Sequence, residues 1–381
     1  MITRACYCSR QQAMRAVDFA DGIDQNAATD RAIQTAAENI DRQLHRRFYP
    51  VDATRYFDWP NQGGSGGGQY GNPWRLWFDQ FDCVVLTGLV TGGITIPLSQ
   101  VYLEPVNHPV EGKPYYEYME LDRSSTASFG GNALSPQHSV VPSGTWGYGA
   151  DADPAGALAA NVGTSDTTIT VTDGSRTGVG DLLVLGYGRG SAPYPSSLGY
   201  AGAIAPYTGE RVLVTGVAMV STGVTFSGPA TASDADNVLA VPDGTQFAAG
   251  EVLLLDAERM LITEITGNSL VLRRAWDGTV LETHTGGTIY AARLLSVTRA
   301  MYGTTAASYS SAAAIYRHRV PPLIRDLAVA EAVNQVLQEG SGYARTVGSG
   351  ADAHPAPGAD LASKWDEADT AHARKSRVRA V

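Results

Sequence analysis

The sequence predicts an α+β fold, and three observations support this class. Apolar residues recur with helical spacing near the N-terminus and again around residues 323–339. Between these segments the pattern changes to the short alternating runs that are typical of strands. The chain also contains 42 glycines and 19 prolines, which indicates many turns and a large β component. We therefore expect an N-terminal helical hairpin, a small sheet and C-terminal helices, interrupted by an inserted all-β repeat domain.

The composition fits a soluble globular protein of two or three domains. The chain has 381 residues, of which 44% are hydrophobic and 17% are charged. Its net charge of -10 argues against sequence-specific DNA binding, which needs clustered Lys and Arg. Cys6, Cys8 and Cys83 do not predict a disulfide framework, so we expect assembly in a reducing cytoplasm. Neither a secretory signal nor an apolar run of the roughly 20 residues that span a membrane is predicted.

Two helices are predicted at the start of the chain. Ser9 and Gln12 have the spacing of a capping box, which predicts a short helix over residues 9–21. A longer helix is predicted over Thr29–Pro50, where proline is expected to end it. The apolar face of this helix comprises Ile33, Ala36, Ala37, Ile40, Leu44 and Phe48, and the polar face comprises Arg31, Gln34, Glu38, Asp41, Arg42, His45 and Arg46.

Seven strands are predicted after Pro50, separated by turn-forming residues. They cover Arg55–Trp59, Trp74–Phe78, Cys83–Leu89, Ile94–Ile96, Gln100–Pro109, Tyr115–Leu121 and Ser139–Tyr148. The glycine-rich tract at residues 61–72 is predicted to be a loop. It contains formal matches to G-x-S-x-G and G-x-G-x-x-G, but neither match lies between a strand and a helix. We therefore predict no nucleophile elbow and no dinucleotide site there.

Several short motifs together carry a family resemblance. They are LHRRFYP (44–50), RYFDWPN (55–61), PWRLWF (73–78), LEPVN (103–107) and WGY (146–148). In this combination the chain resembles the head-to-tail adaptor (head-completion or connector) proteins of long-tailed bacteriophages, of the actinophage type. The resemblance implies a non-enzymatic structural subunit without a cofactor, located at the head–tail interface of the virion.

The resemblance also implies the partners of such a subunit. It would form a ring of identical copies, dodecameric in the family, that is seated on the portal protein. Below the ring it would contact a stopper or tail-terminator protein. Genomic DNA would pass through the ring without sequence-specific binding, and no membrane would be involved.

An internal repeat is predicted within residues 155–319. Asp173-Gly174 and Gly180 recur 70 positions later as Asp243-Gly244 and Gly250. A Glu-Arg-x-Leu sequence occurs at Glu210 and at Glu258, and an Arg-Ala sequence followed by Gly-Thr occurs at Arg274 and at Arg299. Short strands with glycine turns predict a pair of small β-barrels or sandwiches. The repeat predicts structure but names no chemistry.

The repeats divide the chain into four predicted segments. Residues 1–154 and 320–340 would form one adaptor core, because Pro321-Pro322 opens a predicted helix over Leu323–Glu339. Residues 155–319 would be inserted into that core. Residues 341–381 would be a linker and a C-terminal docking segment, with a final helix within Asp360–Arg379 or, alternatively, a disordered tail.

The resemblance and the charge pattern nominate contact residues. The candidates for portal contact are Trp365, Arg374, Lys375, Arg377 and Arg379, since aromatic residues and arginine are frequent interface hot spots. The candidates for contact between ring subunits are Arg31, Glu38, Arg42 and Arg46 on the second helix.

Catalytic and metal sites have weaker support. None of the seven histidines has zinc-site spacing. The pairs Asp151/Asp153 and Asp234/Asp236 could bind calcium, although turn and capping roles are commoner for such residues. The alternative function is a carbohydrate-binding or glycan-cleaving virion protein that uses the β-repeat domain, since strand aromatics and paired carboxylates serve both activities.

Overall fold

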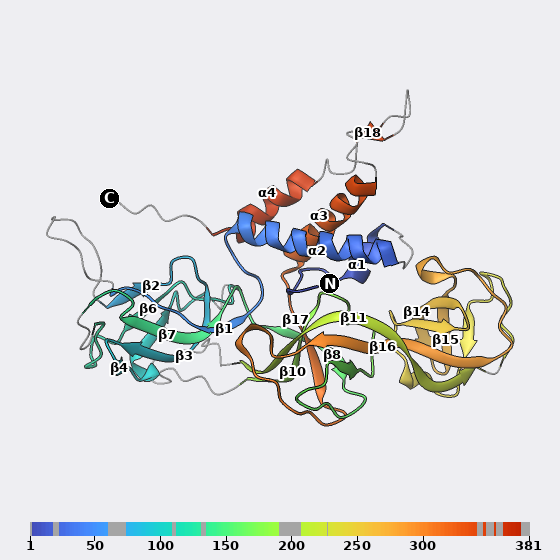
Figure 1. Cartoon of the computed structure of the whole chain (residues 1–381), viewed down its shortest axis with the longest axis horizontal. Coiled ribbons are helices and arrows are strands. Elements are labelled where there is room, and N and C mark those ends of the chain that lie inside the picture. Colours follow the sequence, from blue (N-terminus) through green and yellow to red (C-terminus); the bar gives the residue numbers. More distant parts are fainter. Residues whose placement is uncertain are drawn as a thin grey trace.

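The chain adopts an α+β fold in a computed structural model that describes residues 2–17, 23–59, 74–108, 112–130, 135–189, 207–226, 228–340, 346–347, 354–355 and 361–374. Figure 1 shows the four described helices gathered on one side, with most of the strands below them. The small sheet that contains β3 (Cys83–Thr91) and β7 (Val140–Trp146) lies at one end of the molecule. Strands β14 (Glu258–Thr266) and β15 (Ser269–Arg273) lie at the other end, and the long strands β11 (Tyr207–Phe226) and β16 (Gly287–Thr298) run towards them from the centre.

The helices pack around one apolar cluster. Helix α1 (Arg10–Ala16) begins with the predicted capping box between Ser9 and Gln12, which is confirmed. Helix α2 (Ile23–Leu44) buries the predicted apolar face against α3 (Pro322–Gly340) and α4 (Leu361–His372). The N-terminal segment, including Ile2 and Tyr7, is buried in the same cluster. The helical core is therefore assembled from both ends of the chain.

The prediction that α2 continues to Pro50 is wrong. The helix ends at Leu44, and His45 adopts a left-handed backbone conformation with φ of 50°. The next residues fold back into the interior, so that Phe48 is buried and its N–H donates to the Tyr7 hydroxyl at 2.9 Å. Burial of this aromatic residue between the helices and the sheet stabilises the early exit from the helix.

Two small sheets enclose a second apolar cluster. One has the order β1-β7-β3-β4 and the other the order β2-β6-β5. Their members are β1 (Val51–Thr54), β2 (Arg75–Trp77), β3 (Cys83–Thr91), β4 (Ile94–Thr95), β5 (Val101–Glu104), β6 (Tyr118–Leu121) and β7 (Val140–Trp146). The predicted strand Arg55–Trp59 is wrong, because the strand precedes it and only Phe57 forms a bridge, with Val140. Strand β1 pairs with β7, which brings Val51 opposite Trp146.

Most of the remaining strands form one antiparallel sheet. Its path is β12-β15-β14-β13-β16-β11-β10-β17-β8, and β9 pairs with β16. The strands are β8 (Ala152–Ala157), β9 (Thr168–Thr170), β10 (Leu182–Arg189), β11 (Tyr207–Phe226), β12 (Val238–Ala240), β13 (Val252–Leu255), β14 (Glu258–Thr266), β15 (Ser269–Arg273), β16 (Gly287–Thr298) and β17 (Ala314–His318). A separate short pair is formed by β18 (Thr346–Val347) and β19 (His354–Pro355).

The repeated sequences occupy matching positions around two separate apolar clusters. The proximal copy contains Glu210 on β11 and Arg299 directly after β16, and the distal copy contains Glu258 on β14 and Arg274 directly after β15. In the distal copy the two strands are joined by a tight turn at Gly267. In the proximal copy β11 and β16 instead remain paired from Leu213 to Phe226, and the whole distal copy lies between them in the sequence. The distal copy is thus nested in the hairpin of the proximal one.

The proximal copy is joined to the first sheet by a close approach of two backbones. Gly303, with φ of 83°, lies in the turn η5 (Met301–Gly303), and a Cβ atom at this position would lie 2.1 Å from the Asp52 carbonyl oxygen. We predict that Gly303→Ala lowers the free energy of unfolding by about 2–4 kcal/mol, through the clash and the backbone strain. The control is Gly267→Ala, which has φ of 59° and no neighbouring atom within 4 Å. That substitution should lower the free energy of unfolding by only about 1 kcal/mol. Equal losses of unfolding free energy for the two variants in chemical denaturation would contradict the prediction.

Candidate functional site

Each repeat copy contains a buried carboxylate held by one arginine. Arg299 forms two hydrogen bonds to Glu210, both of 2.6 Å, and Arg274 forms two to Glu258, both of 2.7 Å. Both glutamate side chains are 0% exposed. Backbone N–H groups of Ala300 and Ala307 donate to Glu210, and those of Ala275 and Glu282 donate to Glu258. The same clamp therefore ties a strand to the loop after its partner in both copies.

The distal clamp has an additional histidine. The Nε2 atom of His284 lies 2.9 Å from Glu258 and its Nδ1 atom lies 2.7 Å from Asp256. The corresponding bridge in the proximal copy is formed by Tyr309, which pairs with Val162 as His284 pairs with Ala230. The two clamps share a scaffold but differ in the side chain at this position.

Glu258 is a structural anion rather than an acid–base group. Burial alone would raise its pKa, but hydrogen bonds from Arg274, two backbone N–H groups and His284 lower the pKa to about 2. Its two oxygens accept five hydrogen bonds in total. Because its oxygens are committed to these donors, the carboxylate serves to hold the loop and not to transfer a proton.

A third buried carboxylate joins the C-terminal helix to the small sheet. Asp82 lies 3.3 Å from Arg46 and forms a hydrogen bond with Arg374, directly after α4. The Arg374 N–H also donates to the Leu44 carbonyl at 3.1 Å, where α2 ends. His372 at the end of α4 packs edge-on against Phe48 and Tyr148. This contact set, which we call the Asp82 latch, fixes the end of α4 against α2 and the small sheet.

Arg46, one of the candidates for ring contacts, is buried within the chain. Only 7% of its side chain is exposed, and its guanidinium lies 4.4 Å from the centre of the Tyr115 ring. Because α2 ends before this residue, Arg46 points into the interior and does not lie on the polar helix face.

The other three candidates for ring contacts remain on the surface of α2. The side chains of Arg31 and Glu38 are 62% and 65% exposed, and Arg42 is also exposed. Arg31 pairs with Glu339 of α3 at 2.8 Å, Glu38 lies 3.7 Å from Arg4, and Arg42 donates to Asn39 at 3.2 Å. These exposed pairs are weak and leave the side chains accessible to another molecule.

The candidates for portal contact occupy two different environments. Trp365 is half-buried and packs against the helical cluster. Arg374 belongs to the Asp82 latch. Lys375, Arg377 and Arg379 lie outside the residues that the structure describes. The described portion of this segment thus packs against the rest of the same chain.

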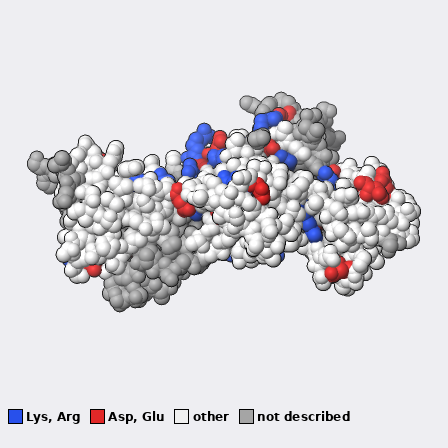
Figure 2. Space-filling view, turned by 60° about the horizontal axis from the view of Figure 1, so that its bottom comes forward, with Lys and Arg blue, Asp and Glu red and all other residues white. Residues whose placement is uncertain are grey.

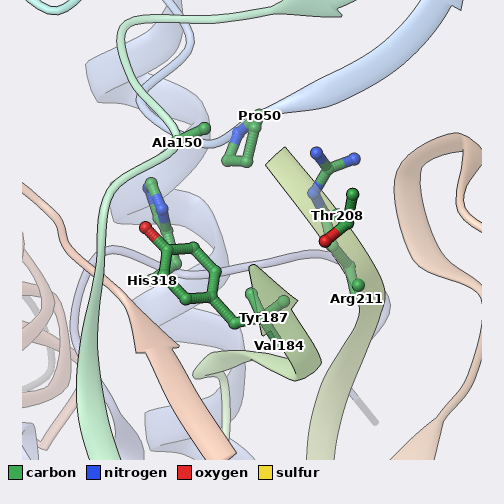
Figure 3. Close-up of a pocket in the computed structure, with 8 residues that line it drawn as sticks. Pro50, Ala150, Val184, Tyr187, Thr208, Arg211 and His318 are labelled. Atoms are coloured by element: carbon green, nitrogen blue, oxygen red, sulfur yellow. The ribbon is translucent and has the colours of Figure 1, made fainter. Parts of the chain in front are cut away.

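A small pocket lies where the helices, the first sheet and the proximal copy meet (Figure 3). It contains about 280 Å³ of atom-free space, including solvent at its mouth, and is lined by Pro50, Ala150, Val184, Tyr187, Thr208, Gly209, Arg211 and His318. Its cation is already paired, since Arg211 lies 2.9 Å from Asp52. The Nε2 atom of His318 donates to the Phe48 carbonyl at 2.6 Å. These two polar groups therefore stabilise the junction itself.

His318 should make the protein sensitive to mild acid. Burial lowers the pKa of His318 from 6.5 to about 4. Between these two values the unfolded chain binds a proton that the folded chain excludes, so this contribution to stability is complete above pH 6.5 and is lost as the pH falls towards 4. We predict a loss of about 2 kcal/mol between pH 7 and pH 5 from this residue alone.

The measurement is urea denaturation at both pH values for the wild type and for His318→Gln, whose amide can still donate to Phe48. The variant should lose about 2 kcal/mol less than the wild type on acidification. Identical pH dependence of the two proteins would refute the role of His318.

The carboxylate pairs considered for calcium have other partners. Asp153 pairs with Arg319 at 2.6 Å, and Asp236 accepts hydrogen bonds from the backbone and side chain of Thr231. Among the residues described, no group of three or more His, Cys, Asp or Glu side chains is placed to hold a metal ion. No helix in the described ranges is both long and apolar enough to cross a membrane. The motif matches at residues 61–72 lie outside the residues that the structure describes.

The sequence analysis missed the roles of Glu210, Glu258 and Asp82. A signal for the first two was present, because Glu-Arg and Arg-Ala each occur twice within the repeats. Matching Glu210 with its arginine required the nested order of the copies, because Arg299 lies 89 residues later in the chain. Asp82 had no comparable signal. Comparisons of the chain with protein-family models, curated proteins and solved structures found no match.

Proposed function

We propose that this protein is a structural ring subunit of a phage head-to-tail connector, which joins the portal to the next head-completion protein. In this proposal residues 1–154 and 320–340 form the adaptor core, with α1 and α2 as its helical hairpin. Residues 155–319 are the inserted repeat domain, and residues 341–381 carry the portal contact. The copies line a channel through which genomic DNA passes.

The observation that carries the proposal is the convergence of the motifs that resemble the adaptor family. The HRRFYP segment and the WGY segment lie about 100 residues apart in the sequence, yet they pack on each other. The Tyr148 N–H donates to the Arg47 carbonyl at 2.8 Å, and the Phe48 and Tyr148 rings are 5.1 Å apart. Residues that resemble one family and also pack together support the resemblance better than the same residues scattered over the surface would.

The position of α4 supports a role in docking. Its inner side carries the buried Ala368 and the half-buried Trp365, and its outer side exposes Asp366, Glu367 and Asp369. The Asp82 latch places the end of this helix beside α2 and the small sheet. Arg374, the last described residue of this segment, is therefore held at a fixed point, and we propose that the portal contact lies beyond it.

The test is the mass of the purified protein, alone and with its portal, measured by mass photometry. The proposal predicts a discrete closed oligomer, formed either alone or on the portal, with a single stoichiometry. A monomer at every concentration that also ignores the portal would refute it.

A further inference from the structure

Two arginines, Arg47 in the HRRFYP segment and Arg55 shortly after it, form no ion pair among the described residues. The guanidinium of Arg55 lies 3.6 Å from the centre of the Phe81 ring and 5.3 Å from that of Trp146. Its Nε atom is buried and has no hydrogen-bond acceptor. Arg47 is exposed and lies 5.3 Å from the centre of the Tyr49 ring. Both side chains thus rest on aromatic rings, and Arg47 also interacts electrostatically with Asp41, whose carboxylate is already hydrogen-bonded to Arg4 and Tyr7.

This arrangement differs from that of many other arginines in the chain. Arg10, Arg211, Arg274, Arg293 and Arg299 each pair with a carboxylate at 2.9 Å or less. Contact with an aromatic ring stabilises a guanidinium by about 0.5–2 kcal/mol, which offsets only part of the cost of burying it. Burial, together with the nearby Arg47, lowers the pKa of Arg55, as expected for a cation without an anion beside it.

An acidic surface is present on the same chain. Asp366, Glu367 and Asp369 are exposed on the outer side of α4, and none of them forms an ion pair within the described residues. Acidic residues outnumber basic ones by 38 to 28, so the commonest anion offered by a second copy is a carboxylate. On the face shown in Figure 2, basic and acidic side chains occur in small, interspersed groups and not as one broad basic area. A nucleic-acid surface needs more clustered cations than this pair provides.

We propose that Arg47 and Arg55 bind carboxylates of a second copy of this chain, supplied by Asp366, Glu367 and Asp369 of its α4. Arginine forms paired, charge-assisted hydrogen bonds with carboxylates, and the aromatic rings beneath the guanidinium groups fix their orientation. A basic patch on one copy that meets an acidic helix on the next is a heterologous contact, the type that closes into a ring. The inference rests on the proposed function, because it assigns the contact between neighbouring ring subunits.

The experiment compares charge reversals by sedimentation velocity over a range of protein and salt concentrations. Arg47→Glu combined with Arg55→Glu should raise the dissociation constant of the contact at least about tenfold. Arg47→Glu alone is the second variant, since an exposed side chain can be reversed with little risk to folding. The matched control is Arg123→Glu, another exposed arginine, which should assemble like the wild type. Circular dichroism and thermal melting establish that each variant is folded.

A charge swap provides the second arm. Adding Asp366→Arg and Glu367→Arg to the double variant should restore assembly, since each reversed contact again joins opposite charges. Failure of the swap to restore assembly, or unchanged assembly of the arginine variants, would overturn the inference. If the arginine variants lost salt-sensitive binding to a short DNA duplex but assembled like the wild type, the inference would also be overturned, in favour of DNA phosphate as the ligand. If the arginine variants assemble unchanged, or lose only DNA binding, the ring itself survives. A wild type that never assembles refutes the proposed function as well.

Discussion

Replacing Glu258 with glutamine is expected to lower the free energy of unfolding by about 3–5 kcal/mol. The substitution removes the negative charge that compensates Arg274 and leaves that cation buried with a neutral partner. It also turns an amide NH₂ group towards some of the five donors that the carboxylate satisfies, so that donor faces donor. Unfolding should begin in the distal copy, whose loop at residues 279–284 is held by this clamp.

Glu264→Gln is the matched control, since that glutamate lies on the same strand and is exposed. It should change the stability by less than about 0.5 kcal/mol. Urea denaturation followed by tryptophan fluorescence measures the loss, and Trp276 reports on the distal copy directly. A loss below about 1 kcal/mol for Glu258→Gln would show that the clamp contributes little.

Asp82→Ala is expected to have an effect of similar size, about 3–5 kcal/mol, on the helical core. The substitution leaves Arg46 and Arg374 without their shared anion, and Arg46 is too deeply buried to reach solvent. The end of α4 then loses its tie to the small sheet. Hydrogen exchange of the α4 amides should accelerate, while that of the ten-stranded sheet should remain unchanged.

Arg374→Ala separates the contribution of Arg374 to the Asp82 latch from that of Arg46. Asp82 keeps Arg46 as a counter-ion in this variant, so the loss should be smaller, about 1–2 kcal/mol. Exchange in α4 should nevertheless rise as much as in Asp82→Ala, since the same tie is cut. If α4 exchanges at the wild-type rate in both variants, Trp365 and Ala368 hold the helix by packing alone.

Local patterns were sufficient to predict part of the secondary structure. The spacing of apolar residues gave α3 to within one residue at each end, and the alternation of residues located β3 and β7. The Ser9–Gln12 capping box also formed as predicted. These features depend on neighbours within a few positions in the chain, which the sequence displays directly.

The errors arose where distant residues override local preference. Pro50 is a strong helix terminator, but α2 ends six residues earlier because Arg46 and Phe48 are drawn into the interior by Asp82, Tyr7 and Tyr148. The repeats were predicted from the sequence, whereas their nesting was not. The order of the motifs does carry a signal, because both Arg-Ala sequences follow Glu258, and the pairing of β11 with β16 shows the nesting directly.

Electron microscopy of the purified protein, with and without its portal, tests the central claim most directly. We predict closed rings of a single stoichiometry that cap the portal, with the end of α4 facing it and the distal repeat copies at the far end of each subunit. Single, unattached subunits in the presence of the portal would contradict the account.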